Sequence, residues 1–202
     1  MWSLKPTAAP ALEPVTTAEA KTHARIDTGA DDAMVGNLII AARQWAEEFT
    51  RRAFITQTWE LRMDGFPPTD PSPIYRRTDE IIIPRPPLQS VTSIAYTDGN
   101  GAAQTWSSTK YQKDINLEPA RIRPTEAEDW PDTQAATYAT VVVTFVAGYG
   151  TAASTVPEAI KTAIKMLVEH WYEHRGVMTD TRFVKVPMAV ESLLAKYRIW
   201  LL

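Results

Sequence analysis

The sequence contains no cysteine, the first of several absences that narrow its function. Without cysteine there is no disulfide, no thiolate metal ligand and no cysteine nucleophile, so packing alone has to stabilise the fold. The sequence also has no glycine loop followed by Lys and Ser or Thr, and no Gly-x-Gly-x-x-Gly segment after a predicted strand. Because both common phosphate-binding loops are missing, nothing in the sequence favours a nucleotide-binding enzyme.

Long apolar runs are absent as well. No stretch is long and apolar enough to span a bilayer. The segment from Met1 to Pro14 carries one lysine and no continuous apolar run, which argues against a signal peptide. We therefore expect a protein that has no membrane contact and is assembled in the cytoplasm.

The sequence also has no excess of positive charge. The 21 Lys and Arg residues are outnumbered by 24 Asp and Glu residues, which gives a net charge of −3. Affinity for nucleic acid comes mainly from clustered Lys and Arg, so this balance opposes a dedicated DNA-binding protein. The pairs Arg51-Arg52 and Arg76-Arg77 are short, and we interpret them as solvated ends of structural elements.

What the sequence does contain is enough apolar residues for a core, at 45% of the chain. Thr16 and Glu19 have the spacing of a capping box and predict a short helix that ends near Ile26. Asp31 or Asp32 can cap a second, longer helix, which is expected to end near residue 52.

Two later helices are predicted to begin at Pro157 and Pro187, because proline suits the first position of a helix. The second and third helices carry apolar stripes with the same spacing of four, three and four residues, which are Leu38, Ala42, Trp45 and Phe49, and then Ile160, Ile164, Leu167 and Trp171. The matching stripes predict that these two helices pack together. The last helix has an apolar face of Val190, Leu193, Leu194 and Tyr197.

Between the second and third helices the apolar period changes to two residues. The alternation from Ile55 to Met63 predicts a half-buried strand. Further strands are predicted at residues 80–83, 90–96, 104–106, 111–115, 121–123 and 137–146. The segment Asp98-Gly99-Asn100-Gly101 suits a hairpin turn between the strands at 90–96 and 104–106.

These patterns predict an α+β fold, in which a β-rich insertion interrupts a small helical bundle. We expect residues 1–54 to form the N-terminal part of the helical domain and residues 55–150 to form the β-rich insertion. Residues 151–202 are expected to complete the helical domain. The two parts of the bundle therefore have to meet across the whole insertion.

One possible metal site is present. His170, Glu173 and His174 fit the pattern His-x-x-Glu-His on a predicted helix, in which two histidines can share a zinc ion and the glutamate can act as a base. A catalytic zinc needs a third protein ligand, and His23 is the only other histidine. Because polar helix faces often combine His and Glu, we favour a solvated or interfacial face, with a zinc hydrolase as the alternative.

The seven tryptophans divide into two groups. Three lie on predicted apolar stripes and are interpreted as core residues: Trp45, Trp59 and Trp171. Four lie in loops or near the ends of the chain and are either core residues or anchors of a protein interface: Trp2, Trp106, Trp130 and Trp200. The chain ends on four apolar residues, Ile199-Trp200-Leu201-Leu202. Because chain ends usually extend into water, this ending predicts docking against another protein.

Short motifs in a characteristic order extend over nearly the whole chain. They are Leu4-Lys5-Pro6-Thr7, Glu13-Pro14-Val15-Thr16, Ala41-Ala42-Arg43-Gln44-Trp45, Arg52-Ala53-Phe54-Ile55-Thr56-Gln57-Thr58-Trp59, Pro84-Arg85-Pro86-Pro87-Leu88-Gln89-Ser90-Val91, Phe145-Val146-Ala147-Gly148-Tyr149-Gly150, Val156-Pro157-Glu158-Ala159-Ile160 and His170-Trp171-Tyr172-Glu173. Each motif is ordinary, and only their combination is specific. The combination resembles the head-tail connector, or adaptor, family of long-tailed bacteriophages and gene transfer agents.

The resemblance implies a mostly helical fold with a β insertion and a structural protein, not an enzyme, that has neither catalytic residues nor a cofactor. It implies a homo-oligomeric ring, expected to be dodecameric, between the portal protein and a tail-side head-completion or stopper protein in a virion or phage-like particle. DNA is expected to pass through the channel of this ring without specific binding. A weakly acidic protein suits such a channel because it does not hold phosphate groups.

The resemblance further implies that the C-terminal region, from Val186 to Leu202, docks on the portal protein. The candidate docking residues are Tyr197, Arg198, Trp200, Leu201 and Leu202. The other interpretation is that the chain is an interaction module of a different assembly.

Overall fold

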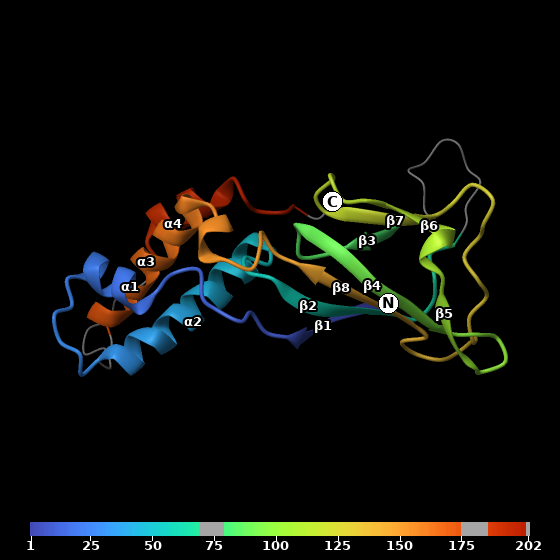
Figure 1. Ribbon diagram of the computed structural model, residues 1–202, viewed down its shortest axis with the longest axis horizontal. Helices are drawn as coiled ribbons and strands as arrows, with labels where there is room; N and C mark the ends of the chain where they lie inside the picture. The colour runs from blue at the N-terminus through green and yellow to red at the C-terminus, as the bar shows by residue number, and fades with distance from the viewer. Residues whose placement is uncertain (69–78, 175–185, 201–202) are drawn as a thin grey trace. The chain divides into compact units, whose positions relative to one another are not determined.

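The computed structural model describes residues 1–68, 79–174 and 186–200 (Figure 1). Their contacts divide the chain into a β unit, Met1–Ala9 with Thr56–Gly148, and a helical unit, Pro10–Ile55 with Tyr149–Leu202. The predicted α+β class is confirmed, because helices and two antiparallel sheets form from separate parts of the chain. The sequence pattern groups all of residues 1–54 with the helices, whereas in the structure the first nine residues belong with the strands.

The helical unit contains α1 (Thr17–Ala24), α2 (Asp32–Thr50), α3 (Glu158–Glu173), α4 (Met188–Ala195) and a short 3-10 helix (Ala153–Thr155). Helix α1 begins with the predicted capping box. The hydroxyl of Thr16 accepts the backbone N–H of Glu19, and the Glu19 carboxylate accepts the backbone N–H of Thr16 at 2.7 Å. These bonds satisfy two donors that have no partner inside the helix.

Helices α2 and α3 pack together in one core, as their matching stripes predicted. The buried face of α2 is rotated from the expected stripe, so Leu38, Trp45 and Phe49 are only partly buried at its edge. The centre of this face includes the charged residues Arg43 and Glu47. A pattern that counts only apolar residues misplaces the face for this reason.

The β unit contains a five-stranded antiparallel sheet in the order β1-β2-β8-β4-β5 and a three-stranded sheet in the order β3-β7-β6. The strands of the larger sheet are β1 (Trp2–Ala8), β2 (Gln57–Met63), β4 (Leu88–Thr97), β5 (Ala103–Trp106) and β8 (Val141–Ala147). Those of the smaller sheet are β3 (Ile81–Ile83), β6 (Tyr111–Asp114) and β7 (Ala120–Pro124), with a 3-10 helix (Ser108–Lys110) before β6. Strand β8 buries alternate residues, as its sequence predicted.

Strand β1 is the one strand of the described chain that the sequence pattern does not predict. It is an edge strand that pairs only with β2, and nearly all of its side chains are exposed. No alternation of apolar and polar residues is needed under these conditions. Pro6 and Lys5 are residue types that discourage further pairing at an open edge.

Four aromatic rings cluster within the β unit. The rings of Phe66 and Trp130 stack at a centroid distance of 4.7 Å, and Trp106 lies 6.4 Å from Trp130. Tyr96 contacts both Phe66 and Trp106 edge-on. Trp130 is only 9% exposed, so of the two interpretations given for it the core one holds. The two exposed candidate anchors are Trp2 and Trp200.

None of the helices that the structure describes combines the length and the apolar composition needed to cross a bilayer.

Candidate docking site at the end of α2

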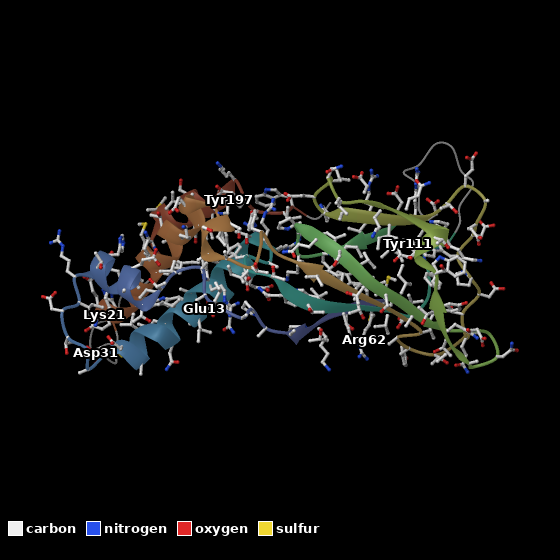
Figure 2. All side chains as sticks on the ribbon, in the orientation of Figure 1. Glu13, Lys21, Asp31, Arg62, Tyr111 and Tyr197 are labelled. Carbon is white, nitrogen blue, oxygen red and sulfur yellow. The ribbon has the colours of Figure 1, made fainter. Side chains whose placement is uncertain are left out.

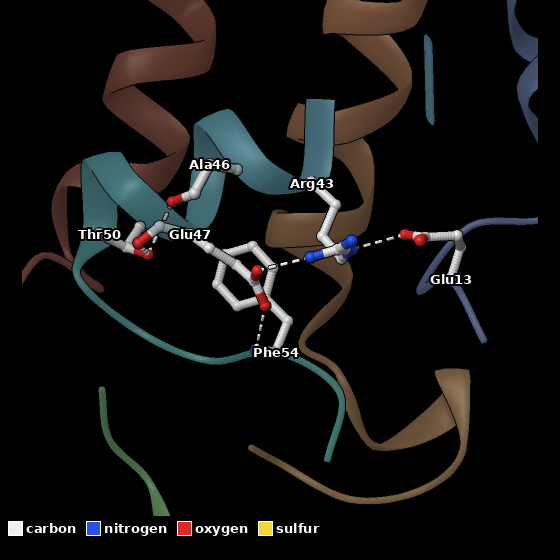
Figure 3. Close-up of polar contacts among 6 residues, drawn as sticks. All are labelled: Glu13, Arg43, Ala46, Glu47, Thr50 and Phe54. Atoms are coloured by element: carbon white, nitrogen blue, oxygen red, sulfur yellow. Dashed lines mark hydrogen bonds and ion pairs between the residues drawn. The ribbon is translucent and has the colours of Figure 1, made fainter. Parts of the chain in front are cut away.

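Helix α2 ends where Arg51 adopts the left-handed conformation, with a φ of 58°. Its backbone N–H then bonds to the carbonyls of Glu47 and Glu48, a common way to close a helix. The chain turns back, and the N–H of Phe54 donates to the Glu47 carboxylate at 2.8 Å (Figure 3). A side chain of the helix therefore fixes the path of the residues that leave it.

A buried ion cluster supports this turn (Figure 3). Arg43 donates from Nε to the carboxylate of Glu13 and from Nη1 to that of Glu47, each at 2.7 Å. Arg43 and Glu47 are each 6% exposed, and their charges compensate each other inside the unit. Burial alone would lower the pKa of Arg43, but the bond to Glu13 and the negative charges of both carboxylates outweigh it and raise this pKa. The arginine therefore stays charged.

The residues that follow α4 run along the fixed end of α2. Tyr197, which is labelled in Figure 2, follows the helix in a turn, and its backbone N–H bonds to the carbonyl of Leu194. Nε of Arg52 donates to the carbonyl of Tyr197 at 2.5 Å, and the N–H of Ile199 donates to the carbonyl of Thr50 at 3.0 Å. Residues 197–200, called here the docking segment, are held by these two bonds to the last residue of α2 and to Arg52 just beyond it.

A row of rings and one cation accompanies these bonds. Trp45 and Phe49 stack on the surface of α2 at a centroid distance of 5.2 Å. The guanidinium carbon of Arg198 lies 5.0 Å from the ring centre of Phe49 and 4.3 Å from that of Trp200. These are distances at which a cation is attracted to an aromatic face. The row, called here the aromatic column, ends at Trp200, which is 70% exposed.

The structure brings Tyr197, Arg198 and Trp200 together in this site. Two other candidate docking residues, Leu201 and Leu202, lie outside the described residues.

Sequence reasoning missed the residues that receive the docking segment, which are Phe49, Thr50 and Arg52. Arg52 was expected at a solvated end of an element, but it is only 7% exposed and bonds to Tyr197. That expectation is wrong for Arg52 and correct for its neighbour Arg51, which is exposed. No local pattern separates the two, because the partner of Arg52 is 145 residues away.

The histidine motif lies elsewhere, at the end of α3. The rings of His170 and His174 are 4.7 Å apart, and Nδ1 of His174 lies 2.8 Å from the carbonyl oxygen of His170. Burial and the charge of His174 lower the pKa of His170, although Glu173 opposes this. His23 faces Glu169 instead, at 3.4 Å. Within residues 1–68, 79–174 and 186–200, no three His, Asp or Glu side chains are grouped to hold a metal ion.

Residues 13–199 match the family of head completion proteins. The chain belongs to this family. The matched range begins at Glu13 of the ion cluster and ends at Ile199, so it includes α2 and most of the docking segment. No curated protein sequence matches the chain.

Three solved structures share the fold. A chain from the neck of an empty GTA particle computed with C6 symmetry has a TM-score of 0.78 and 22% identity, over 99% of this chain and 97% of that one. A chain from the virion of a native gene transfer agent (GTA) particle has a TM-score of 0.76 and 22% identity, over 98% and 97%. A chain from the neck of a native GTA particle computed with C12 symmetry has a TM-score of 0.74 and 21% identity, over 99% and 97%.

Proposed function

We propose that this chain is a structural head-tail adaptor, a subunit of the joint between the head and the tail of a phage or phage-like particle. The observation that carries the proposal is the match to the head completion protein family over residues 13–199. The particle is assembled in the bacterial cytoplasm, and the chain is part of the virion and has no catalytic activity.

The adaptor forms a ring that extends the DNA channel. The solved chains with the same fold come from GTA necks computed with C6 and C12 symmetry, which supports a ring, and twelve copies would satisfy both symmetries. In such a ring one face of each subunit packs on a different face of the next, and the contacts close on themselves. The net charge of −3 favours the passage of DNA over its retention.

On the head side the ring docks on the portal protein, and on the tail side it contacts a stopper or another head-completion protein. Portal docking uses Tyr197, Arg198, Trp200, Leu201 and Leu202. Support for this assignment comes from Trp200, a large aromatic side chain that is mostly exposed beside a fixed helix end. Exposed tryptophan and arginine are the residue types most often found as energetic centres of protein interfaces.

The experiment is deletion of the gene in a strain that produces the particle, followed by electron microscopy. Heads that contain a portal but carry no tail are the expected product, and expression of the intact chain restores tailed particles. Normal numbers of tailed particles from the deletion strain would overturn the proposal.

Two alternatives are an interaction module of another assembly and a zinc hydrolase that uses His170, Glu173 and His174. Metal analysis of the purified protein separates the second from the adaptor. Stoichiometric zinc that is lost in His170→Ala or His174→Ala would favour the hydrolase.

A further inference from the structure

We infer that the end of α2 orients Trp200 before the partner arrives, with Phe49, Thr50 and Arg52 as positioning residues for the docking segment. This inference rests on the proposed function, because it concerns the same segment. It adds a second set of residues, far away in the sequence, on which docking depends.

Two hydrogen bonds to the backbone of the segment determine its path. The carbonyl of Thr50 is at the end of α2, where the helix offers no N–H to pair with it, and Ile199 supplies that N–H. The carbonyl of Tyr197 accepts from the buried guanidinium of Arg52. A hydrogen bond from a charged donor that is shielded from water is stronger than an exposed one. The backbone is therefore held on both sides of Arg198.

The aromatic column then determines the direction of the side chains. Arg198 lies between Phe49 and Trp200, and Phe49 is itself stacked on Trp45. A planar guanidinium stacks on aromatic faces in a way that a lysine ammonium does not. The indole of Trp200 is thus exposed to a partner but restrained by its neighbour.

This arrangement matters because binding has to immobilise the groups that make the contact. Ordering one flexible side chain weakens binding by about 2- to 12-fold. A side chain that is already ordered in the free protein avoids this loss. Removal of the Phe49 ring from the column is therefore expected to weaken docking even though Trp200 itself is unchanged.

The test compares Phe49→Leu, which removes the aromatic face and keeps an apolar side chain, with Phe49→Tyr, which keeps the ring. A second pair is Ile199→Pro, which removes the N–H that bonds to Thr50, and Ile199→Val, which keeps it.

Each variant is labelled with ¹⁵N-tryptophan, and the Trp200 indole signal is assigned with Trp200→Phe. The heteronuclear NOE of this indole measures its fast motion, and binding is measured on immobilised portal protein from the same particle.

Phe49→Leu and Ile199→Pro are expected to lower the Trp200 NOE and to weaken binding about 2- to 12-fold, whereas both controls match the parent protein. Unchanged NOE and binding in both variants would overturn the inference. If circular dichroism shows that Phe49→Leu is unfolded, the inference is tested with Ile199→Pro alone, because this substitution lies in the segment beyond α4. Trp200→Ala separates the two claims: unchanged portal binding in that variant overturns the proposed docking site itself.

Discussion

At the scale of single residues, the ion cluster of Glu13, Arg43 and Glu47 is the feature on which the docking site depends most. Its carboxylate bond to the N–H of Phe54 fixes the chain where it leaves α2. Next to this point, Thr50 and Arg52 bond to the docking segment. A substitution that breaks the cluster is therefore expected to lower stability and to weaken docking.

We expect Arg43→Met to lower the free energy of unfolding by about 3 kcal/mol, because it leaves the buried Glu47 charge without its arginine partner. Urea unfolding followed by circular dichroism measures the change. The control is Gln44→Ala at the exposed neighbouring position, with an expected change below about 0.5 kcal/mol. Equal stability of Arg43→Met and the parent protein would contradict the role of the cluster.

A second residue-scale prediction concerns Glu19 of the capping box. Hydrogen bonds from the backbone and the hydroxyl of Thr16 lower the pKa of Glu19 from its ordinary value of 4.5. The ionised form is favoured in the folded state, so its stabilisation is complete above pH 4.5 and is lost as the pH falls through the lower, folded pKa.

Glu19→Gln keeps the capping geometry but cannot ionise. We therefore expect the parent protein to lose more thermal stability than Glu19→Gln between pH 5 and about pH 3. If the melting temperatures of the two proteins fall equally across this pH range, the Glu19 charge contributes nothing to stability.

Residue roles were predictable from sequence only where their partners are close. Thr16 and Glu19 are three positions apart, and their roles follow from the spacing alone. Arg43 lies 30 positions from Glu13, and Arg52 lies 145 positions from Tyr197. The fold brings these distant acceptors to both arginines, and the local pair of Arg43 and Glu47, four positions apart, does not by itself show that the two residues are buried.

At the scale of elements, substitution of Gly36 tests whether another part of the protein packs closely against this face of α2. Glycine in a helix interior lowers stability by about 1 kcal/mol relative to alanine, unless a close neighbour requires it. A methyl group at Gly36 would meet no atom within 4 Å in the described structure. Gly36→Ala should therefore raise the free energy of unfolding of the isolated protein by about 1 kcal/mol, measured by urea denaturation. A decrease would mean that something packs closely against this position.

Elements with strong periodicity were predicted well, and those without it were not. The alternation in β2 and β8 and the capping signals of α1 predicted the ends of those elements to within four residues. Strand β1 was missed because its side chains are exposed on both faces, which removes the alternation. The face of α2 was misplaced because charged residues occupy its buried centre.

At the scale of the whole molecule, two separate parts of the sequence form one helical unit. Pro10–Ile55 and Tyr149–Leu202 share a core although Thr56–Gly148 of the β unit lies between them in the sequence. Matching apolar stripes on α2 and α3 predict this pairing from the sequence. The function could not be derived in the same way, because no catalytic motif marks it; it came from the order of many ordinary motifs and from the family match.

Electron cryo-microscopy of the particle neck would show whether the chain forms a ring between the head and the tail, because the helical unit and the β unit can be recognised separately in such a map. We predict a closed ring of this chain below the portal, with the docking segment in contact with the portal protein. A complete neck in which every density belongs to other proteins would show that this chain does not form the joint.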